Sequence, residues 1–167
     1  MTAPSPNRRI AILAAAVFAA DQFTKSAVLE YLRYADEKIV IPGFFKFVHW
    51  VNTGAAWSLF TGNNSILAAV ALGALVALYF ARHHFGAGTR AGQLALGLIF
   101  GGICGNLLDR LLPSRQHVVD FLYFFINSGG REHGFPAFNI ADSAICIGVG
   151  LIFILNWKRE EPPTTGH

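Results

Sequence analysis

The chain has 167 residues, enough for one domain, and 53% of them are hydrophobic while only 14% are charged. A typical globular domain has about 25% charged residues, so this composition excludes an ordinary water-soluble domain. The formal net charge of +3 comes from scattered basic residues that form no continuous stripe, which excludes nucleic acid as an expected partner. Cys104 and Cys146 both fall within apolar segments and imply no disulfide framework.

The first apolar segment follows Arg8 and Arg9, as the apolar region of a secretory signal peptide would. Residues 17–20 include bulky side chains where a cleavage site needs small ones, so we expect a retained helix over residues 10–30. Three further apolar segments predict helices over residues 64–82, 91–112 and 137–157. About 20 apolar residues span the hydrocarbon core of a bilayer. The sequence therefore predicts a membrane all-α bundle of four transmembrane helices, a domain covering residues 10–157.

Two long loops, residues 31–63 and 113–136, connect these helices. In the first loop, aromatic and β-branched residues in Lys38–Ile41 and Phe44–Val51 predict a small sheet at the membrane face. In the second loop, we expect the apolar stretch Phe121–Ile126 to return the chain to the membrane surface.

Four spans put both termini on one side of the membrane. On that side six basic residues lie in short segments beside helix ends: Arg8, Arg9, Arg82, Arg90, Lys158 and Arg159. Six others are spread over the two long loops: Arg33, Lys38, Lys46, Arg110, Arg115 and Arg131. Basic residues in short segments at helix ends mark the cytoplasmic side. We therefore expect residues 1–9 and 158–167 to be cytoplasmic and both long loops to lie on the opposite side.

Charged side chains within a span cost about 2.5–3.5 kcal/mol each on insertion scales, so each one needs a reason. The predicted topology collects the polar residues of the spans at one depth, near the non-cytoplasmic face: Asp21, Lys25, Asn106, Asp109, Arg110, Asn139 and Asp142, with Asp120 in the loop nearby. Each could be an ordinary helix-end residue reaching for water. Their concentration in one layer instead favours a polar site within reach of both lipid and water.

Several hydrolytic chemistries do not fit these residues. A zinc hydrolase needs a histidine-rich ligand set, and Glu132–His133 has no partner at the spacing of HExxH. Ser143 has no evident histidine base nearby, and the GxGD signature of presenilin-type and prepilin-type proteases is absent. Two aspartates remain, Asp120 and Asp142. Carboxylates held close share one proton, so the ionised one draws a proton from water while the protonated one polarises a carbonyl.

Five motifs lie in order along the chain: Asp21-Gln22-Phe23-Thr24-Lys25, Asn52-Thr53-Gly54-Ala55-Ala56-Trp57-Ser58, Gly101-Gly102-Ile103-Cys104-Gly105-Asn106-Leu107-Leu108-Asp109-Arg110, Val118-Val119-Asp120-Phe121 and Phe138-Asn139-Ile140-Ala141-Asp142-Ser143. In this order and on four spans they make the chain resemble the lipoprotein signal peptidase family, also called signal peptidase II. The resemblance covers most of the chain.

The resemblance implies an aspartic endopeptidase of the bacterial inner membrane, with Asp120 and Asp142 as its catalytic pair. Its substrate would be a membrane-bound prolipoprotein that carries diacylglycerol on its lipobox cysteine, cut just before that cysteine. The active site would lie near the periplasmic face. Asn52 and Gly54 would belong to a small periplasmic cradle, built of strands and a short helix, over the site.

The resemblance also implies supporting residues that orient the substrate or the carboxylates: Asn106, Arg110 and Asn139. Asp21 and Lys25, four residues apart on one helical face, can pair, and we expect them to tie the first helix to the bundle. Asp109 would be the counter-ion of Arg110 or of Lys25. Three glycines are expected to allow close helix packing: Gly101, Gly102 and Gly105. Residues 127–134 are longer and richer in glycine than the family pattern, which leaves that loop's geometry open.

We expect general acid–base hydrolysis without a covalent intermediate, a metal or a cofactor. The expected partners of this monomer are the lipid-modified prolipoprotein and membrane lipids. The alternative is a small four-helix transporter or proton relay that uses the same aspartates. A relay should string ionisable groups across the membrane, whereas the inner halves of all four predicted spans are apolar. This pattern favours the protease.

Overall fold

The computed structural model describes residues 5–54 and 62–157. Within them lie four helices that are long and apolar enough to cross a membrane: α1 (Pro6–Tyr31), α2 (Asn64–Ala81), α3 (Arg90–Leu111) and α4 (Ile140–Trp157). The predicted helical bundle is confirmed. Residues 1–4 and the predicted cytoplasmic tail, 158–167, lie outside the described residues.

Local capping signals set where the helices begin. The Ser5 side chain accepts from the Arg8 backbone N–H and Pro6 takes the first helical position, so α1 starts four residues earlier than its apolar pattern predicts. Thr89 caps α3 by accepting from the Gly92 backbone N–H at 3.0 Å. Helix α4 begins at Ile140, three residues later than predicted, because Asn139 serves as its N-cap.

Helix α3 is the centre of the bundle. Half of its membrane-length window is buried, against 11–17% in the other three helices. It packs closely against both α1 and α4, while α2 contacts α3 along its outer side. Glycines make the close approach possible: a Cβ on Gly101 would lie 2.6 Å from the Ala14 carbonyl oxygen, and one on Gly102 would lie 2.5 Å from that of Ala141. The structure therefore agrees with the packing role expected for these glycines.

A four-stranded antiparallel sheet has the order β1 (Glu37–Ile41), β2 (Phe45–Asn52), β3 (Val118–Ser128) and β4 (Arg131–Gly134). The two strands predicted in the first long loop are confirmed. The structure shows Phe121–Ile126 as the middle of β3, paired with β2, and its return to the membrane surface stays a prediction. Its run of aromatic and β-branched residues suits a strand, and Phe121, Tyr123 and Phe125 are its buried positions.

The glycine-rich segment after β3 is a hairpin between β3 and β4. Gly129 and Gly130 form its two-residue turn, with φ of +59° and +73°. Positive φ at both positions is what a type I′ turn needs, and glycine adopts it at little cost. The departure from the family pattern is therefore an extension of the sheet.

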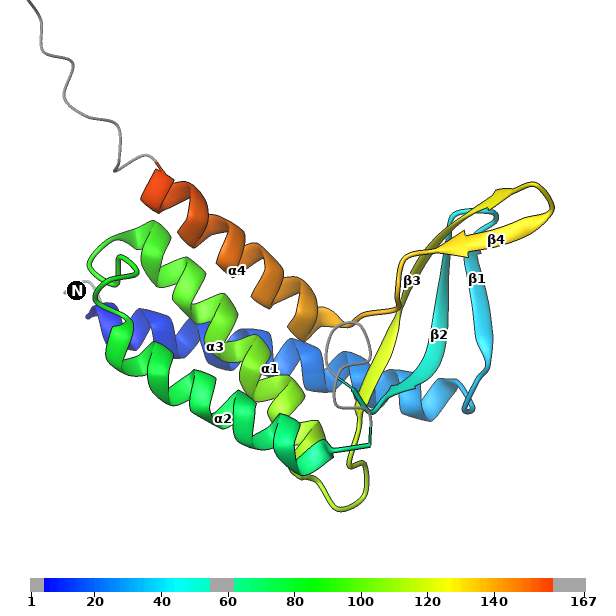
Figure 1. The fold of residues 1–167 in the computed structure, drawn as a ribbon, viewed down its shortest axis with the longest axis horizontal. Helices are drawn as coiled ribbons and strands as arrows, with labels where there is room; N and C mark the ends of the chain where they lie inside the picture. Colours follow the sequence, from blue (N-terminus) through cyan, green and yellow to red (C-terminus); the bar gives the residue numbers. More distant parts are fainter. Residues whose placement is uncertain (1–4, 55–61, 158–167) are drawn as a thin grey trace, which may run out of the picture.

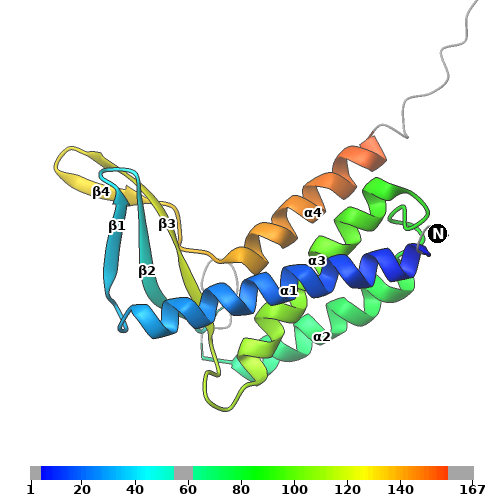
Figure 2. The same ribbon diagram turned by 180° about the vertical axis from the view of Figure 1, so that it is seen from behind.

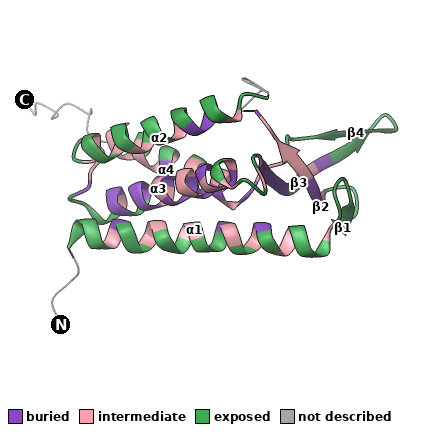
Figure 3. Ribbon diagram, turned by 90° about the horizontal axis from the view of Figure 1, so that it is seen from below, coloured by how far each residue is buried: buried purple, intermediate pink, exposed green. Residues whose placement is uncertain are grey.

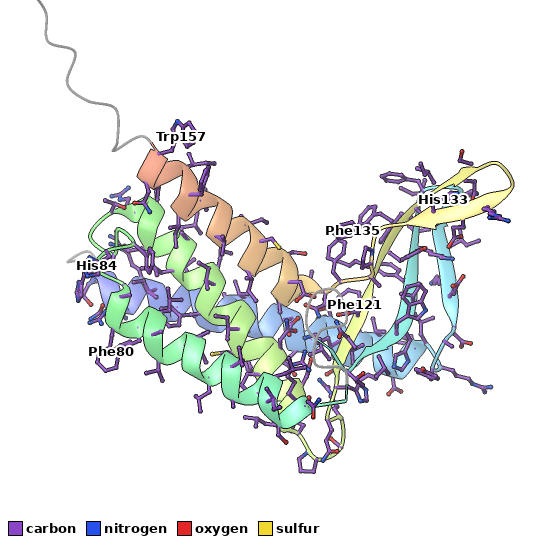
Figure 4. The ribbon with its side chains drawn as sticks, viewed as in Figure 1. Phe80, His84, Phe121, His133, Phe135 and Trp157 are labelled. Carbon is purple, nitrogen blue, oxygen red and sulfur yellow. The ribbon has the colours of Figure 1, made fainter. Side chains whose placement is uncertain are left out.

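The sheet projects from one end of the bundle (Figure 1), and the reverse view shows the same arrangement (Figure 2). The start of α1, the α2–α3 connection and the end of α4 lie together at the opposite end. Figure 4 shows Phe80, His84 and Trp157 at that end and Phe121 at the junction of bundle and sheet. Buried residues concentrate in α3, in the middle of β2 and in the part of β3 nearest the helices (Figure 3). The junction is therefore where a buried polar site can form.

Candidate active site

Asp120 lies near the start of β3, opposite Trp50 of β2 in the sheet register. Asn52 Nδ2 donates to Asp120 Oδ2 at 2.8 Å, and Asn139 Nδ2 donates to Oδ1 at 2.8 Å. The side chain is nearly closed to solvent, since the residue is 4% exposed. Burial, followed by the negative charge of Asp142, raises the pKa of Asp120 from 3.8 to about 7. At neutral pH this carboxyl group can therefore hold a proton.

Asp142 is the third residue of α4, and Asn139 holds it in a reciprocal capping arrangement. The Asp142 backbone N–H donates to Asn139 Oδ1 at 2.9 Å, and the Asn139 backbone N–H donates to Asp142 Oδ2 at 3.2 Å. Asn106 of α3 supplies the remaining donor, from Nδ2 to Asp142 Oδ1 at 2.8 Å. A carboxylate in the first turn is also favoured by the helix dipole. The start of α4 therefore fixes the position of this side chain.

The two carboxylates share one pattern of stabilisation. Each of their four oxygens accepts one N–H, and every donor is a neutral amide: Asn52, Asn106 and Asn139. Among residues 5–54 and 62–157, no lysine or arginine forms an ion pair with Asp120 or Asp142. Dipoles stabilise one negative charge here without a cation that would force both groups to ionise. This is the environment in which two carboxylates share a proton and activate water.

A cluster of four charged residues lies behind the carboxylates, and we call it the ion cluster: Asp21, Lys25, Asp109 and Arg115. Lys25 Nζ lies 2.8 Å from Asp21 Oδ2 and 2.7 Å from Asp109 Oδ2, the second as an ionic contact without hydrogen-bond geometry. Arg115 binds the other oxygen of Asp109 at 2.6 Å. Asp21, Lys25 and Asp109 have no exposed area. Two cations and two anions balance, so the cluster adds no net charge beside the carboxylates.

The ion cluster answers two questions that the sequence left open. The counter-ions of Asp109 are Lys25 and Arg115. Within the described residues, the Arg110 side chain forms no ion pair or hydrogen bond with Asp21 or Asp109. The pairing of Asp21 with Lys25 is confirmed, and Asp21 Oδ1 also accepts from the Ala141 backbone N–H at 3.0 Å. This bond joins α1 directly to the first turn of α4.

Arg110 lies at the end of α3 and holds two segments of the chain. Its Nη2 donates to the Gly54 carbonyl oxygen at 2.8 Å, and its Nη1 donates to Asn64 Oδ1 at 3.3 Å. The Gly54 backbone N–H donates in turn to Asn52 Oδ1 at 3.0 Å, which turns the Asn52 amide group toward Asp120. The part of the expected cradle that follows Gly54 falls within residues 55–61, outside the described residues.

The structure therefore gathers the predicted catalytic pair and its predicted supporting residues at the junction of bundle and sheet. Sequence reasoning missed Arg115, Gln22 and Asn64. Gln22 Nε2 donates to Asp109 Oδ1 at 3.2 Å and to the Gly105 carbonyl oxygen at 3.1 Å. Gln22 lies within a motif and could have been noticed there, whereas Arg115 stands in a Pro-Ser-Arg-Gln turn typical of solvated loops.

A hollow on the surface near the site does not contain the aspartates. It measures about 610 Å³ and lies between the start of α2 and the end of α3, with Asn64, Leu72, Leu107 and Arg110 among its lining residues. It holds no pair of titratable groups that could perform acid–base chemistry. We therefore locate the chemistry at the carboxylate pair, and Arg110 connects the hollow to it.

Comparison with known proteins gives a consistent result. The family model described as "Signal peptidase (SPase) II" matches residues 13–158. The chain is 45% identical over 152 residues to the lipoprotein signal peptidase of Azoarcus sp., which covers 84% of this chain and 78% of the relative. It is 35% identical over 157 residues to that of Bacillus pumilus, covering 92% and 97% respectively.

A solved structure, described as a bacterial membrane enzyme determined by the in meso method at 2.3 Å resolution, has the same fold. Its TM-score is 0.80 at 33% identity, and the match covers 93% of this chain and 92% of that one. A second such structure, at 1.9 Å resolution, gives a TM-score of 0.70 at 34% identity over 88% and 91% of the two chains. With its four membrane-length helices, this is a bacterial inner-membrane protein, and the chain belongs to the signal peptidase II family.

Proposed function

We propose that the protein removes signal peptides from diacylglyceryl-modified prolipoproteins by hydrolysing the peptide bond just before the lipidated cysteine. Asp120 and Asp142 are its catalytic pair in this proposal. The observation that carries it is the arrangement of neutral amide donors around two carboxylates that are joined through Asn139. Membership in the signal peptidase II family supports the reaction class.

The two carboxyl groups take different parts in the reaction. Asp142 is the ionised base, because it stands in the first turn of α4 and accepts two N–H bonds there. It removes a proton from a water molecule, whose oxygen bonds to the carbonyl carbon of the substrate. Asp120, which holds the proton, gives it to the carbonyl oxygen and forms a neutral gem-diol. The C–N bond then breaks, and the diol proton returns to Asp120 as the leaving nitrogen takes the proton from Asp142.

The place of the site favours a substrate that stays in the membrane. The carboxylates lie at the end of the bundle, where the sheet begins, and the surrounding helices expose large apolar side chains toward lipid. A diacylglyceryl cysteine remains in the bilayer beside such a site, since burying acyl chains contributes about 0.8 kcal/mol per CH₂. Both aspartates come from one chain, so a monomer surrounded by membrane lipids suffices.

The distribution of basic residues supports a topology with cytoplasmic termini and a periplasmic sheet. Arg8, Arg9 and Arg82 lie at the end of the bundle opposite the sheet. A topology reporter fused after Lys158 should give a cytoplasmic signal, and one inserted at Gly129 should give a periplasmic signal. The reverse result would place the site away from exported lipoproteins and contradict the proposal.

The catalytic pair is tested by single isosteric substitutions. Asp120→Asn and Asp142→Asn keep the shape of the site but prevent proton sharing, so cleavage of a lipidated precursor should fall by about 10⁴-fold or more. Asp36→Asn is the matched control, because Asp36 is an exposed aspartate near the base of the sheet and should keep normal turnover. Normal turnover by either dyad variant would exclude that residue from catalysis.

Lipid dependence is tested with one purified precursor, with and without the diacylglyceryl group, at equal concentrations in detergent. We expect cleavage of the lipidated form only. Comparable cleavage of both forms would mean that recognition rests on the peptide and that access from the bilayer has no part in it. The alternative of a transporter or proton relay receives no support from the comparisons, and the buried charged residues of the described spans, Asp21, Lys25 and Asp109, gather at one end of the bundle.

A further inference from the structure

Asn106 must present the correct end of its side chain to Asp142. An asparagine amide has a donating NH₂ end and an accepting oxygen end, and the two ends have nearly the same shape. In this structure Nδ2 donates to Asp142 Oδ1 at 2.8 Å, while Oδ1 points in the opposite direction, toward Lys25. Rotation of the amide by 180° would place its oxygen against the carboxylate and remove the only side-chain donor to Asp142 among the described residues.

Two donors face Asn106 Oδ1: the ammonium group of Lys25 at 2.9 Å, and Asn139 Nδ2 at the longer distance of 3.3 Å. Asn139 Nδ2 makes its shorter bond, 2.8 Å, to Asp120 Oδ1, so Lys25 is the principal partner of the Asn106 oxygen. An ammonium group can only donate, so it stabilises the orientation that presents the amide oxygen and disfavours the one that presents the NH₂ group. Lys25 has no exposed area, and its other two contacts, Asp21 and Asp109, also have none. The lysine therefore cannot turn away to water, and its position is fixed by two buried carboxylates.

Asn139 shows that the other amide of the site is oriented without Lys25. Its Oδ1 accepts from the Asp142 backbone N–H at 2.9 Å, and its Nδ2 then reaches Asp120 Oδ1 at 2.8 Å. Helix α4 thus fixes Asn139 by its own backbone. Asn106 stands in the interior of α3, where no backbone N–H is free, so its orientation depends on side chains from outside α3. Of the two that donate to its oxygen, Lys25 is the nearer and the charged one.

We propose that Lys25 is a positioning residue, whose ammonium group holds the Asn106 amide in the orientation that donates to Asp142. This inference rests on the proposed catalytic role of Asp142. It gives Lys25 a part in turnover beyond the structural pairing with Asp21. The function of Asp21 and Asp109 is then to keep Lys25 buried and fixed in position.

The first test separates amide orientation from charge balance. Lys25→Met and Arg115→Met each remove one positive charge from the same cluster, but only Lys25 contacts Asn106. For Lys25→Met, kcat should fall roughly tenfold to hundredfold, as happens when a residue that orients an active-site ligand is lost, with little change in KM. For Arg115→Met, kcat should stay within about threefold of the wild-type value, because its carboxylate partner keeps Lys25. Equal losses in both variants would overturn the proposal.

A second variant covers poor folding of Lys25→Met. The double substitution Lys25→Met with Asp109→Asn restores the net charge of the cluster, since it removes one positive and one negative charge. Its thermal unfolding in detergent should recover toward the wild-type temperature, while kcat stays low because the principal partner that orients Asn106 is missing. Recovery of kcat together with stability would show that Lys25 acts only by balancing charge, and the proposal would be wrong.

A double-mutant cycle then tests whether Lys25 acts through Asn106. Asn106→Ala alone should lower kcat, and adding Lys25→Met to it should lower kcat no further. Independent, multiplying losses would overturn the positioning role of Lys25 while leaving the catalytic pair intact. Normal kcat for Asn106→Ala would instead contradict the donor role assigned to this amide in the proposed function, so the two failures are distinguishable.

Discussion

Two buried lysines, one in the bundle and one in the sheet, are held by carboxylates in contrasting ways. Lys25 lies between Asp21 and Asp109, and all three side chains are 0% exposed. Lys46 on β2 binds Glu37 at 2.8 Å and Glu132 at 3.0 Å, but these side chains are 42% and 37% exposed. The first cluster is closed to water, and the second is open on its acidic side.

The difference shows what each lysine can contribute. Burial alone would lower the pKa of Lys46, but its bonds to Glu37 and Glu132 outweigh burial and raise that pKa. Its ammonium group also lies 5.0 Å from the ring centroids of Tyr123 and Phe125, so the residue joins all four strands. If Lys46 is lost, its glutamates can return to water. If Lys25 is lost, its carboxylate partners cannot reach water, and the stability of the helical bundle decreases.

The contrast between the two lysines is tested most directly by replacing each with methionine and measuring the free energy of unfolding in detergent. Lys25→Met should lose about 3–5 kcal/mol, because it leaves a buried charge without its partner. Lys46→Met should lose at most about 1 kcal/mol, because methionine keeps the apolar stem and the glutamates are solvated. Similar losses for the two variants would mean that solvent exposure of the partners does not decide the cost.

A pair of glycine substitutions asks how tightly each region is built. A Cβ on Gly105 would lie 2.5 Å from Asp21 Oδ2, so Gly105→Ala must displace the carboxylate that holds Lys25. We expect a loss of about 1–3 kcal/mol in stability, together with lower kcat. In the hairpin, Gly129→Ala meets no atom within 4 Å and strains only the backbone, at φ +59°. It should cost about 1–2 kcal/mol and leave kcat unchanged. Loss of activity in the hairpin variant would break the contrast.

The pH dependence of kcat should show which of the two lysines acts on Asp120. The wild-type kcat should fall as the pH rises through about 7, because Asp120 then loses the proton that the pair shares. The positive charge of Lys25 lowers the pKa of Asp120. The falling limb of the kcat–pH profile should therefore move to higher pH in the residual activity of Lys25→Met. Lys46→Met should leave the limb in place. A limb that moved equally in both variants would show that the sheet also acts on Asp120.

The smallest expected effect is the response to salt. Raising the ionic strength to about 1 M shortens the screening length to about 3 Å, which weakens partly exposed ion pairs. The difference in unfolding free energy between wild type and Lys46→Met should therefore shrink by a few tenths of a kcal/mol. The corresponding difference for Lys25→Met should stay constant. Thermal unfolding at two salt concentrations measures both.

The helices could be predicted from the sequence because apolar length alone nearly decides a membrane span. Asp120 and Asp142 could be predicted because few titratable residues were available at the right depth. The middle of β3 was not predicted as a strand, because a continuous apolar run is compatible both with a strand and with a segment at the membrane surface. Only its pairing with β2 decides, and pairing is a property of two segments that lie far apart in the sequence.

The hydrogen bonds behind the carboxylates were beyond sequence reasoning for another reason. Asn106 and Asn139 could be named as supporting residues, but which end of each amide faces which partner depends on atoms from three helices. Arg115 illustrates the same limit. Its turn resembles a solvated loop, and only the folded chain brings its guanidinium group to Asp109.

The bond from the Ala141 backbone N–H to Asp21 joins residues 120 positions apart in the chain. It has a consequence for biosynthesis. Helix α4 leaves the ribosome after the other three described spans, and with it come Asp142, Asn139 and the backbone N–H that Asp21 accepts. A nascent chain with three inserted spans can already pair Lys25 with Asp21 and Asp109, but it has only one of the two aspartates. We therefore expect the growing protein to be inert until α4 is in the membrane, so that proteolysis begins only when all four spans are in place.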